Sequence, residues 1–107
     1  MLETSIREGF YFMSIQVLKV SGNSNANAVA QAIIEYVLKD SIVNIDCIGI
    51  KASYTVTKAL IQATEYLVKS GFRFNLRPYY IKVNTEENGM QPVSKTAIRW
   101  TLIAKEK

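Results

Sequence analysis

The sequence predicts a two-layer α/β sandwich in the order β-α-β-α-β-β, with both helices on one face of a mixed four-stranded sheet. Two segments with helical spacing each follow a short segment rich in β-branched residues, and two alternating segments come last. Strands separated by a helix are expected to pair in parallel through right-handed crossovers, and the last two to pair antiparallel. Two helices cannot cover both faces of four strands, so we expect them on the same face.

The first half of the chain predicts a strand and then a helix. Residues 14–21 are rich in apolar and β-branched types and stop at Gly22, which is typical of a strand. From Ala26 onward the apolar residues recur at helical spacing, with polar residues between them, which predicts an amphipathic helix. Ser24 or Asn25 can cap this helix, because a short polar side chain can accept hydrogen bonds from the amides of the first turn.

A second strand and a second helix follow. Residues 43–50 predict a strand, and the segment from Tyr54 to Ser70 predicts a helix that ends at Gly71 as its C′ residue. The apolar residues of this helix cover more than one stripe, since Ile61 and Val68 widen the main face. The width predicts a second packing partner, which is either a sheet edge or another subunit.

The last part of the chain predicts a hairpin. Residues 73–84 and 95–104 alternate between apolar and polar side chains, and Asn88-Gly89 between them is a turn signal. Pro78 cannot donate to a sheet ladder, so it indicates a strand edge or a bulge. The large aromatic residues are expected in the core or in subunit contacts: Tyr36, Tyr66, Phe74 and Trp100.

Composition limits the classes of function. A chain of 107 residues fits one domain, and we divide it into a loose arm at residues 1–12 and a folded domain at 13–107, with Met13 at its start. The sequence has no histidine and one cysteine, Cys47, which we expect to be an inert core thiol. This excludes an internal disulfide, the usual zinc sites and catalysis by serine–histidine or cysteine–histidine pairs. We expect no metal and no cofactor.

No apolar run is long enough to span a membrane, and the first residues lack the core of a signal peptide. We therefore expect no membrane partner and an intracellular location, in the cytoplasm, the nucleus or both. The net charge of +4 is a mild excess that permits binding to nucleic acid without requiring it.

Three segments resemble the Alba superfamily of small nucleic-acid-binding proteins, over about Ser14 to Lys105. IQVLKVSGNSNANAVAQAI is most similar to the stage V sporulation protein S branch, and CIGIKASYTVTKALIQATEYL is similar to the strand, loop and second helix of the superfamily. NGMQPVSKTAIRWTLIAKEK resembles the hairpin and last strand of eukaryotic Alba proteins. The resemblance implies an Alba-like fold for residues 13–107 and a symmetric dimer that binds RNA, DNA or both.

The basic residues differ in part from the Alba pattern. Two junction lysines of archaeal members fall opposite Gly22 and Asn23, and neither position is basic here. Lys58 matches the lysine that the Alba family has in its second helix. Lys51 lies just before the predicted second helix and can substitute for basic residues that the family has nearby. The hairpin carries three more basic residues: Lys82, Lys95 and Arg99. Its tip carries two glutamates that would repel phosphate: Glu86 and Glu87.

The junction between the first strand and the first helix is rich in asparagine and serine. Amides at a helix N-terminus can hold an anion, and Asn23, Ser24 and Asn25 can donate further hydrogen bonds to phosphate oxygens. The same residues can instead serve only to turn and cap the chain. The glycine and lysine spacing of a nucleotide P-loop is absent.

The alternation of the last two strands places four cations on one side together with Tyr79. These are Arg73, Arg77, Lys95 and Arg99, opposite a side that holds Phe74, Leu76, Ile98 and Trp100. A basic face with an aromatic ring suits single-stranded nucleic acid, because phosphates pair with the cations while bases stack. The alternative is an ordinary exposed sheet surface.

No residues in the sequence form a catalytic constellation. We therefore expect a non-enzymatic protein that binds RNA, DNA or both with low sequence specificity, acts as a homodimer and has no small-molecule substrate. The candidate contact residues are Asn23, Ser24, Asn25, Lys51, Lys58, Arg73, Arg77, Lys82, Lys95 and Arg99. The alternative is a regulatory or developmental protein-interaction module of the same fold, with weak or no nucleic-acid binding.

Overall fold

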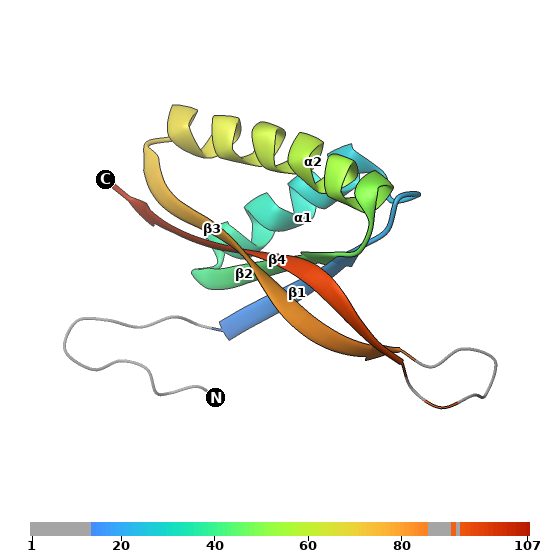
Figure 1. The fold of residues 1–107 in the computed structure, drawn as a ribbon. Coiled ribbons are helices and arrows are strands. Elements are labelled where there is room, and N and C mark those ends of the chain that lie inside the picture. Colours follow the sequence, from blue (N-terminus) through green and yellow to red (C-terminus); the bar gives the residue numbers. More distant parts are fainter. Residues whose placement is uncertain (1–13, 86–90, 92) are drawn as a thin grey trace.

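The elements of the computed structural model, which describes residues 14–85, 91 and 93–107, follow the predicted order. They are β1 (Ser14–Val20), α1 (Ala26–Leu38), β2 (Ser41–Cys47), α2 (Ile50–Lys69), β3 (Phe72–Thr85) and β4 (Val93–Glu106). The strands form one mixed sheet, and both helices cover the same face of it (Figure 1). The predicted fold class is confirmed. The expected arm at residues 1–12, Met13, the Asn88-Gly89 turn and the glutamates at 86 and 87 lie outside the described residues.

Asn25 caps α1. Its backbone is extended, and its side-chain Oδ1 accepts a hydrogen bond from the Ala28 amide at 3.0 Å. The sequence allows either Ser24 or Asn25 as the cap, and the structure selects Asn25. Ser24 instead closes the preceding turn, since its hydroxyl oxygen accepts from the Ser21 amide at 3.0 Å.

The boundary between β2 and α2 differs from the prediction. The sequence predicts a strand over residues 43–50 and a helix from Tyr54, but the strand ends at Cys47 and the helix begins at Ile50. Gly49 turns the chain between them with φ 91°, a conformation that favours glycine. Its carbonyl accepts the first hydrogen bond of the helix at 3.0 Å. Because apolar residues lie on both sides of Gly49, the sequence pattern does not indicate the end of the strand there.

The end of α2 matches the prediction. The helix ends at Lys69, and Gly71 reverses the chain with φ 89°, as expected for a C′ glycine. The Gly71 carbonyl also accepts a hydrogen bond from the Lys107 amide at 2.9 Å. This bond joins the last residue of the chain to the turn between α2 and β3.

The strand order is β1-β2-β4-β3, which corrects one predicted pairing. β1 and β2 pair in parallel as predicted, but β3 does not pair with β2, because β4 lies between them and is antiparallel to both. β4 carries Leu102, whose side chain is fully buried. β3 carries Pro78, which has no amide to donate and therefore suits an edge strand. The sequence predicts either an edge or a bulge at Pro78, and the structure shows the edge.

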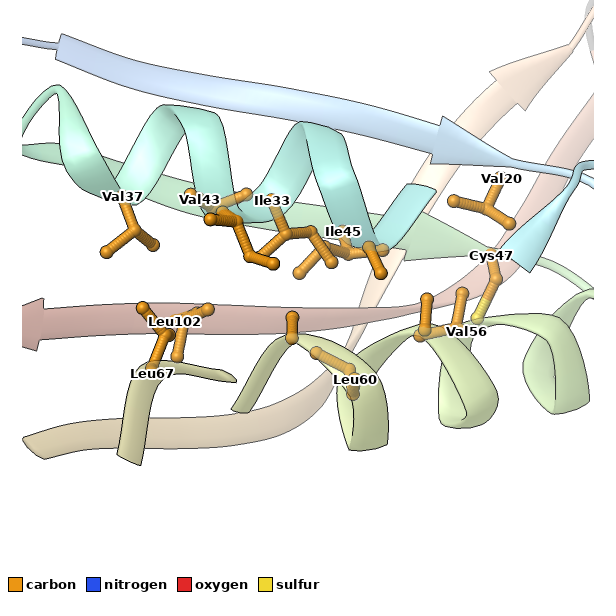
Figure 2. Packing of buried hydrophobic residues seen from close by; sticks show 14 of the residues in the cluster. Val20, Ile33, Val37, Val43, Ile45, Cys47, Val56, Leu60, Leu67 and Leu102 are labelled. Atoms are coloured by element: carbon orange, nitrogen blue, oxygen red, sulfur yellow. The ribbon is translucent and has the colours of Figure 1, made fainter. Parts of the chain in front are cut away.

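The core lies between the helices and the inner strands. Its largest fully buried side chains come from both helices and from β2 and β4: Ile33, Val43, Ile45, Val56, Leu67 and Leu102. Figure 2 shows these side chains meeting in one layer, with Cys47 at one end of it. Cys47 is buried, so its predicted place in the core is confirmed.

The large aromatic residues divide into two groups. Tyr36 and Trp100 are partly buried and pack against the core. Phe74 and Tyr66 are exposed over 37% and 45% of their surface, so the prediction that they lie in the core is wrong for these two residues. A subunit contact for them stays a prediction.

We expect Leu102→Ala to lower the free energy of unfolding by about 2–5 kcal/mol, because it leaves a cavity among fully buried neighbours. Ile15→Ala is the control, since Ile15 is 61% exposed and its truncation should cost less than about 1 kcal/mol. Urea unfolding followed by circular dichroism measures both. Similar losses for the two variants would contradict the proposed position of the core.

Candidate nucleic-acid interface

Three parts of the chain meet at the end of the sheet where β1 and β2 finish. The last pair between β2 and β4 is Cys47 with Ile98, and β3 and β4 continue past it as a two-stranded arm, residues 81–85 with 93–97. Figure 1 shows this arm projecting past the sheet on the side where α2 begins and where the chain passes from β1 into α1. We call the β1–α1 junction (residues 21–25), the start of α2 and the arm together the carboxyl edge.

The polar side chains of the junction use their acceptor oxygens within the chain. Asn25 Oδ1 accepts from the Ala28 amide, and Asn23 Oδ1 accepts from the Lys51 ammonium. Ser24 Oγ accepts from the Ser21 amide. An asparagine amide group keeps its donor hydrogens when its oxygen accepts, whereas the Ser24 hydroxyl lies 3.3 Å from the Ser21 hydroxyl and can donate to it. The junction therefore serves the local turn, as one reading of the sequence expects, and still offers donors to an anion.

Lys51 covers the junction. Its Nζ lies 3.4 Å from Asn23 Oδ1, and its aliphatic stem passes close to Gly22. A Cβ atom on residue 22 would lie 2.7 Å from Lys51 Cγ, which is too close for a normal contact. Gly22 is thus the residue that lets Lys51 approach. The positive charge that the junction lacks in its own sequence reaches it from the first turn of α2.

Lys58 lies two turns further along α2 and contacts an aromatic ring. Its Nζ is 4.6 Å from the centre of the Tyr54 ring, and both side chains are exposed. This is a cation–π contact between residues four apart on one helix face. Tyr54 is not among the candidates predicted from the sequence, although its spacing of four residues from Lys58 indicates that the two can meet on one helix face.

Arg99 is engaged by a carboxylate. Its Nε and Nη2 donate to the two oxygens of Asp46 at 2.7 and 2.9 Å, and the two side chains are only 25% and 10% exposed. The hydrogen bonds to Asp46 raise the pKa of the Arg99 guanidinium above its ordinary value. Arg99 remains a cation, but its charge is compensated by Asp46, a partner that the sequence analysis did not identify.

The four cations predicted to share one side of β3 and β4 do lie on one face of the sheet, but they are distributed along the whole length of the two strands. The pairing register places Tyr79 opposite Arg99 and Arg77 opposite Thr101 on the sheet face away from the helices. The Arg77 guanidinium lies 4.8 Å from the centre of the Tyr79 ring. Arg73 pairs with Lys105 at the far end of the sheet, next to the end of α2. The structure therefore does not bring Arg73 to the carboxyl edge.

A hydrogen-bonded chain runs across this same face. The hydroxyl groups of Tyr79 and Thr101 lie 2.8 Å apart, and the Thr101 hydroxyl is 2.6 Å from Asn44 Oδ1. The chain links β3, β4 and β2 and holds the Tyr79 hydroxyl in place. Pro78 did not shift the strand register, so Tyr79 stays on the predicted side.

The arm carries basic residues on both of its sides. Lys82 pairs with Thr96 and donates to its hydroxyl at 2.9 Å, while Lys95 pairs with Val83. Successive residues of a strand point to opposite sides, so these two lysines face opposite ways. Six of the ten candidate contact residues belong to the carboxyl edge: Asn23, Ser24, Asn25, Lys51, Lys82 and Lys95.

The polar groups at the carboxyl edge are of chemical types that contact phosphate in complexes of proteins with nucleic acids. Within the described residues there is no group of three or more cysteine, aspartate and glutamate side chains placed to hold a metal ion. Among the same residues, no helix has the length and apolar character needed to cross a membrane. The edge instead presents amide, hydroxyl and ammonium groups, which supply most contacts to the backbone of nucleic acids.

A comparison with protein-family models matches residues 16–105 to Stage V sporulation protein S (SpoVS). The chain belongs to this family. SpoVS is an Alba-like family, so the resemblance seen in the sequence is confirmed, and of the two branches that the sequence resembles the match is to the sporulation branch. The matched range contains every candidate contact residue, from the junction to Arg99.

No curated protein matches the chain. Among solved structures, the chain is similar to precorrin-6y C5,15-methyltransferase from Geobacter metallireducens GS-15, with 12% sequence identity and a TM-score of 0.37. The similarity covers 85% of this chain and 44% of the methyltransferase chain, so this chain spans less than half of its length. A TM-score this low carries no argument about function.

We expect Asp46→Asn to lower the free energy of unfolding by about 1–3 kcal/mol, because the half-buried Arg99 guanidinium loses its charged acceptor. Asp40→Asn makes the same chemical change at an exposed turn residue with φ 62°, a conformation that asparagine tolerates. Its stability should stay within about 0.5 kcal/mol of the original. Urea unfolding compares the two, and equal stabilities for both variants would show that the pair contributes nothing.

Proposed function

We propose that this chain is a non-enzymatic protein that binds RNA, DNA or both with low sequence specificity and acts as a homodimer. The observation that carries the proposal is the contact of Lys51 with Asn23, which puts an ammonium group beside the polar junction at the start of α1. A cation, neutral donors and a helix N-terminus at one place form a suitable site for a backbone phosphate.

The start of α1 adds amides and a favourable dipole to this site. Asn25 satisfies the Ala28 amide, while the amides of Ala26 and Asn27 precede it and have no partner within the helix. The aligned peptide dipoles place roughly half a positive charge at this end of the helix. The Lys51 charge adds to that field, so an anion gains from both.

The arm and the sheet face would extend the contact along a strand. Lys82 and Lys95 lie on the arm, and Arg77 lies beside Tyr79 on the face away from the helices. Contacts of this kind reach phosphates more than base edges, which gives low sequence specificity and strong dependence on salt. Arg99 should contribute little directly, since Asp46 compensates its charge.

An exposed apolar patch on α2 supports the homodimer. Ile61 and Val68 are 60% and 55% exposed, and with Phe74 of β3 they line a shallow hollow at the end of α2 away from Lys51. Exposed apolar patches mark interaction surfaces, because burying them removes apolar area from water. A second copy placed on this patch would join two basic surfaces in one particle and leave both carboxyl edges accessible.

The same patch favours a second candidate function. A protein-interaction module of regulatory or developmental type would use Ile61, Val68 and Phe74 to bind a different protein. The missing junction lysines and the compensated Arg99 agree with this candidate. The two functions differ in whether the chain retains nucleic acid at low salt.

We expect Lys51→Ala to weaken the binding of unrelated sequences, and to reduce the slope of log affinity against log salt by about 0.9 on duplex DNA, because one phosphate contact is lost. Lys58→Ala should weaken binding in the same way. Filter-binding titrations of labelled single-stranded RNA and duplex DNA at two salt concentrations measure both effects.

Lys39→Ala is the matched control for these lysine variants. Lys39 follows the last turn of α1, so the substitution removes the same charge at the other end of that helix. It should bind almost as the original chain does. If Lys39→Ala and Lys51→Ala weaken binding equally, the site assignment is wrong. If the original chain retains neither RNA nor DNA at low salt, the interaction module is favoured.

We expect the chain to sediment as a dimer and Ile61→Asp to sediment as a monomer with unchanged circular dichroism, because a charge in the patch opposes its burial. Gln62→Asp is the control. It adds the same charge at the next residue of α2, which is exposed and does not line the hollow formed by Ile61, Val68 and Phe74. Analytical ultracentrifugation separates the outcomes. A monomeric original chain would rule out the homodimer.

A further inference from the structure

A hollow at the carboxyl edge is not explained by the phosphate contacts. It has a volume of about 330 Å³ and lies where the ends of β1 and β2 meet the arm. Val20 and Gly22 contribute from one side, and Val83, Asn84 and Ala97 contribute from the arm. Small-ligand sites in proteins start at about 300 Å³, so the hollow is large enough to admit a flat heterocycle.

The chemistry of the hollow suits a nucleobase. The aliphatic residues of the wall are Val20, Ile48, Val83 and Ala97, which can pack against the faces of a flat ring. Asn84 lines the same hollow, and an asparagine amide can both donate to and accept from the edge of a base. Ser21 and Thr85 add hydroxyl groups to the lining. Apolar walls with polar groups at defined places are typical of sites that hold small ligands.

The charged residues that line the hollow do not give it a free negative charge. Asp46 lines it, but both of its carboxylate oxygens accept from Arg99. Lys19 also lines it, and its exposed side chain brings positive charge to the rim. A neutral base attached to a phosphate therefore fits the hollow better than a cationic or metal ligand does.

The hollow adjoins the phosphate site. Ser21 and Gly22 both line it, and the next residue is Asn23, whose side chain contacts Lys51. Gly22 therefore lines the hollow and also lies against the Lys51 stem. A nucleotide whose phosphate lies at Asn23 and Lys51 has its base within reach of the hollow.

We propose that the hollow receives one unpaired base of the bound strand, while its phosphate lies at Asn23 and Lys51. This inference rests on the proposed function, because it deepens the role of the same edge. A base within a duplex enters such a hollow only if it leaves the stack, which costs free energy. The hollow therefore favours single-stranded or bulged nucleic acid over a continuous duplex.

The test uses single-stranded RNA that contains one 2-aminopurine, whose fluorescence is quenched when it stacks on neighbouring bases. The hollow has no aromatic residue among its described lining, so a base that enters it leaves the stack and brightens severalfold. We expect the full chain to produce this rise. Ala97→Leu, which fills the hollow, should abolish the rise and weaken binding to single-stranded RNA about tenfold, while duplex DNA affinity stays unchanged.

Gln31→Leu is the control, because Gln31 is an exposed residue of α1 outside the hollow and outside the arm. It should bind and brighten as the original chain does. Asn84→Ala is a second test that does not depend on packing, since Asn84 is exposed at the surface. It should reduce the fluorescence rise and weaken single-stranded binding severalfold while thermal unfolding stays unchanged.

The outcomes separate the two proposals. RNA binding without a change in fluorescence, and with full affinity in Ala97→Leu and Asn84→Ala, would overturn the base site and leave the proposed function standing. The free 2-aminopurine nucleoside monophosphate is a second probe. If it binds through Asn84 while no strand is retained, the base site is supported and the proposed function fails. If neither probe binds, both proposals are overturned.

Discussion

The antiparallel pairing of β4 with β2 fixes the positions of the other main contacts in this protein. It places Leu102 opposite Val43, and both side chains are fully buried beneath the helices. The same register sets Arg99 opposite Asp46, which permits their paired hydrogen bonds. This pairing stops at Cys47 and Ile98, so residues 93–97 of β4 pair only with β3 and form the arm. One register thus positions the core, the ion pair and the arm.

Covering only one face of the sheet has consequences for the site. The helices bury the apolar side of the inner strands, and the other side is stabilised by polar contacts such as the Tyr79–Thr101–Asn44 chain. These contacts satisfy the polar side chains without a second layer of helices. The candidate interface therefore forms where the sheet is open, at its carboxyl edge and along the face away from the helices.

The charge at the β1–α1 junction comes from outside the junction. Asn23 and its neighbours are neutral, and Lys51 reaches them from a helix that begins after another strand. Gly22 leaves room for the lysine stem, so the absence of a side chain there has a function in packing. The junction sequence lacks the two lysines of archaeal Alba proteins, which by itself suggests that a phosphate site is missing. In the folded chain, however, the Lys51 ammonium group lies beside Asn23.

The order of the elements, the one-sided packing of the helices, a cap at Ser24 or Asn25 and an edge or bulge at Pro78 could all be predicted from the sequence alone. These follow from periodicity, local hydrogen bonding and the missing proline amide, all of which act over a few residues. Tertiary structure decided that β4 lies between β2 and β3, that Arg99 pairs with Asp46 and that Lys51 meets Asn23. Those contacts join residues 53 and 28 positions apart, and no local rule specifies which distant partner a side chain will meet.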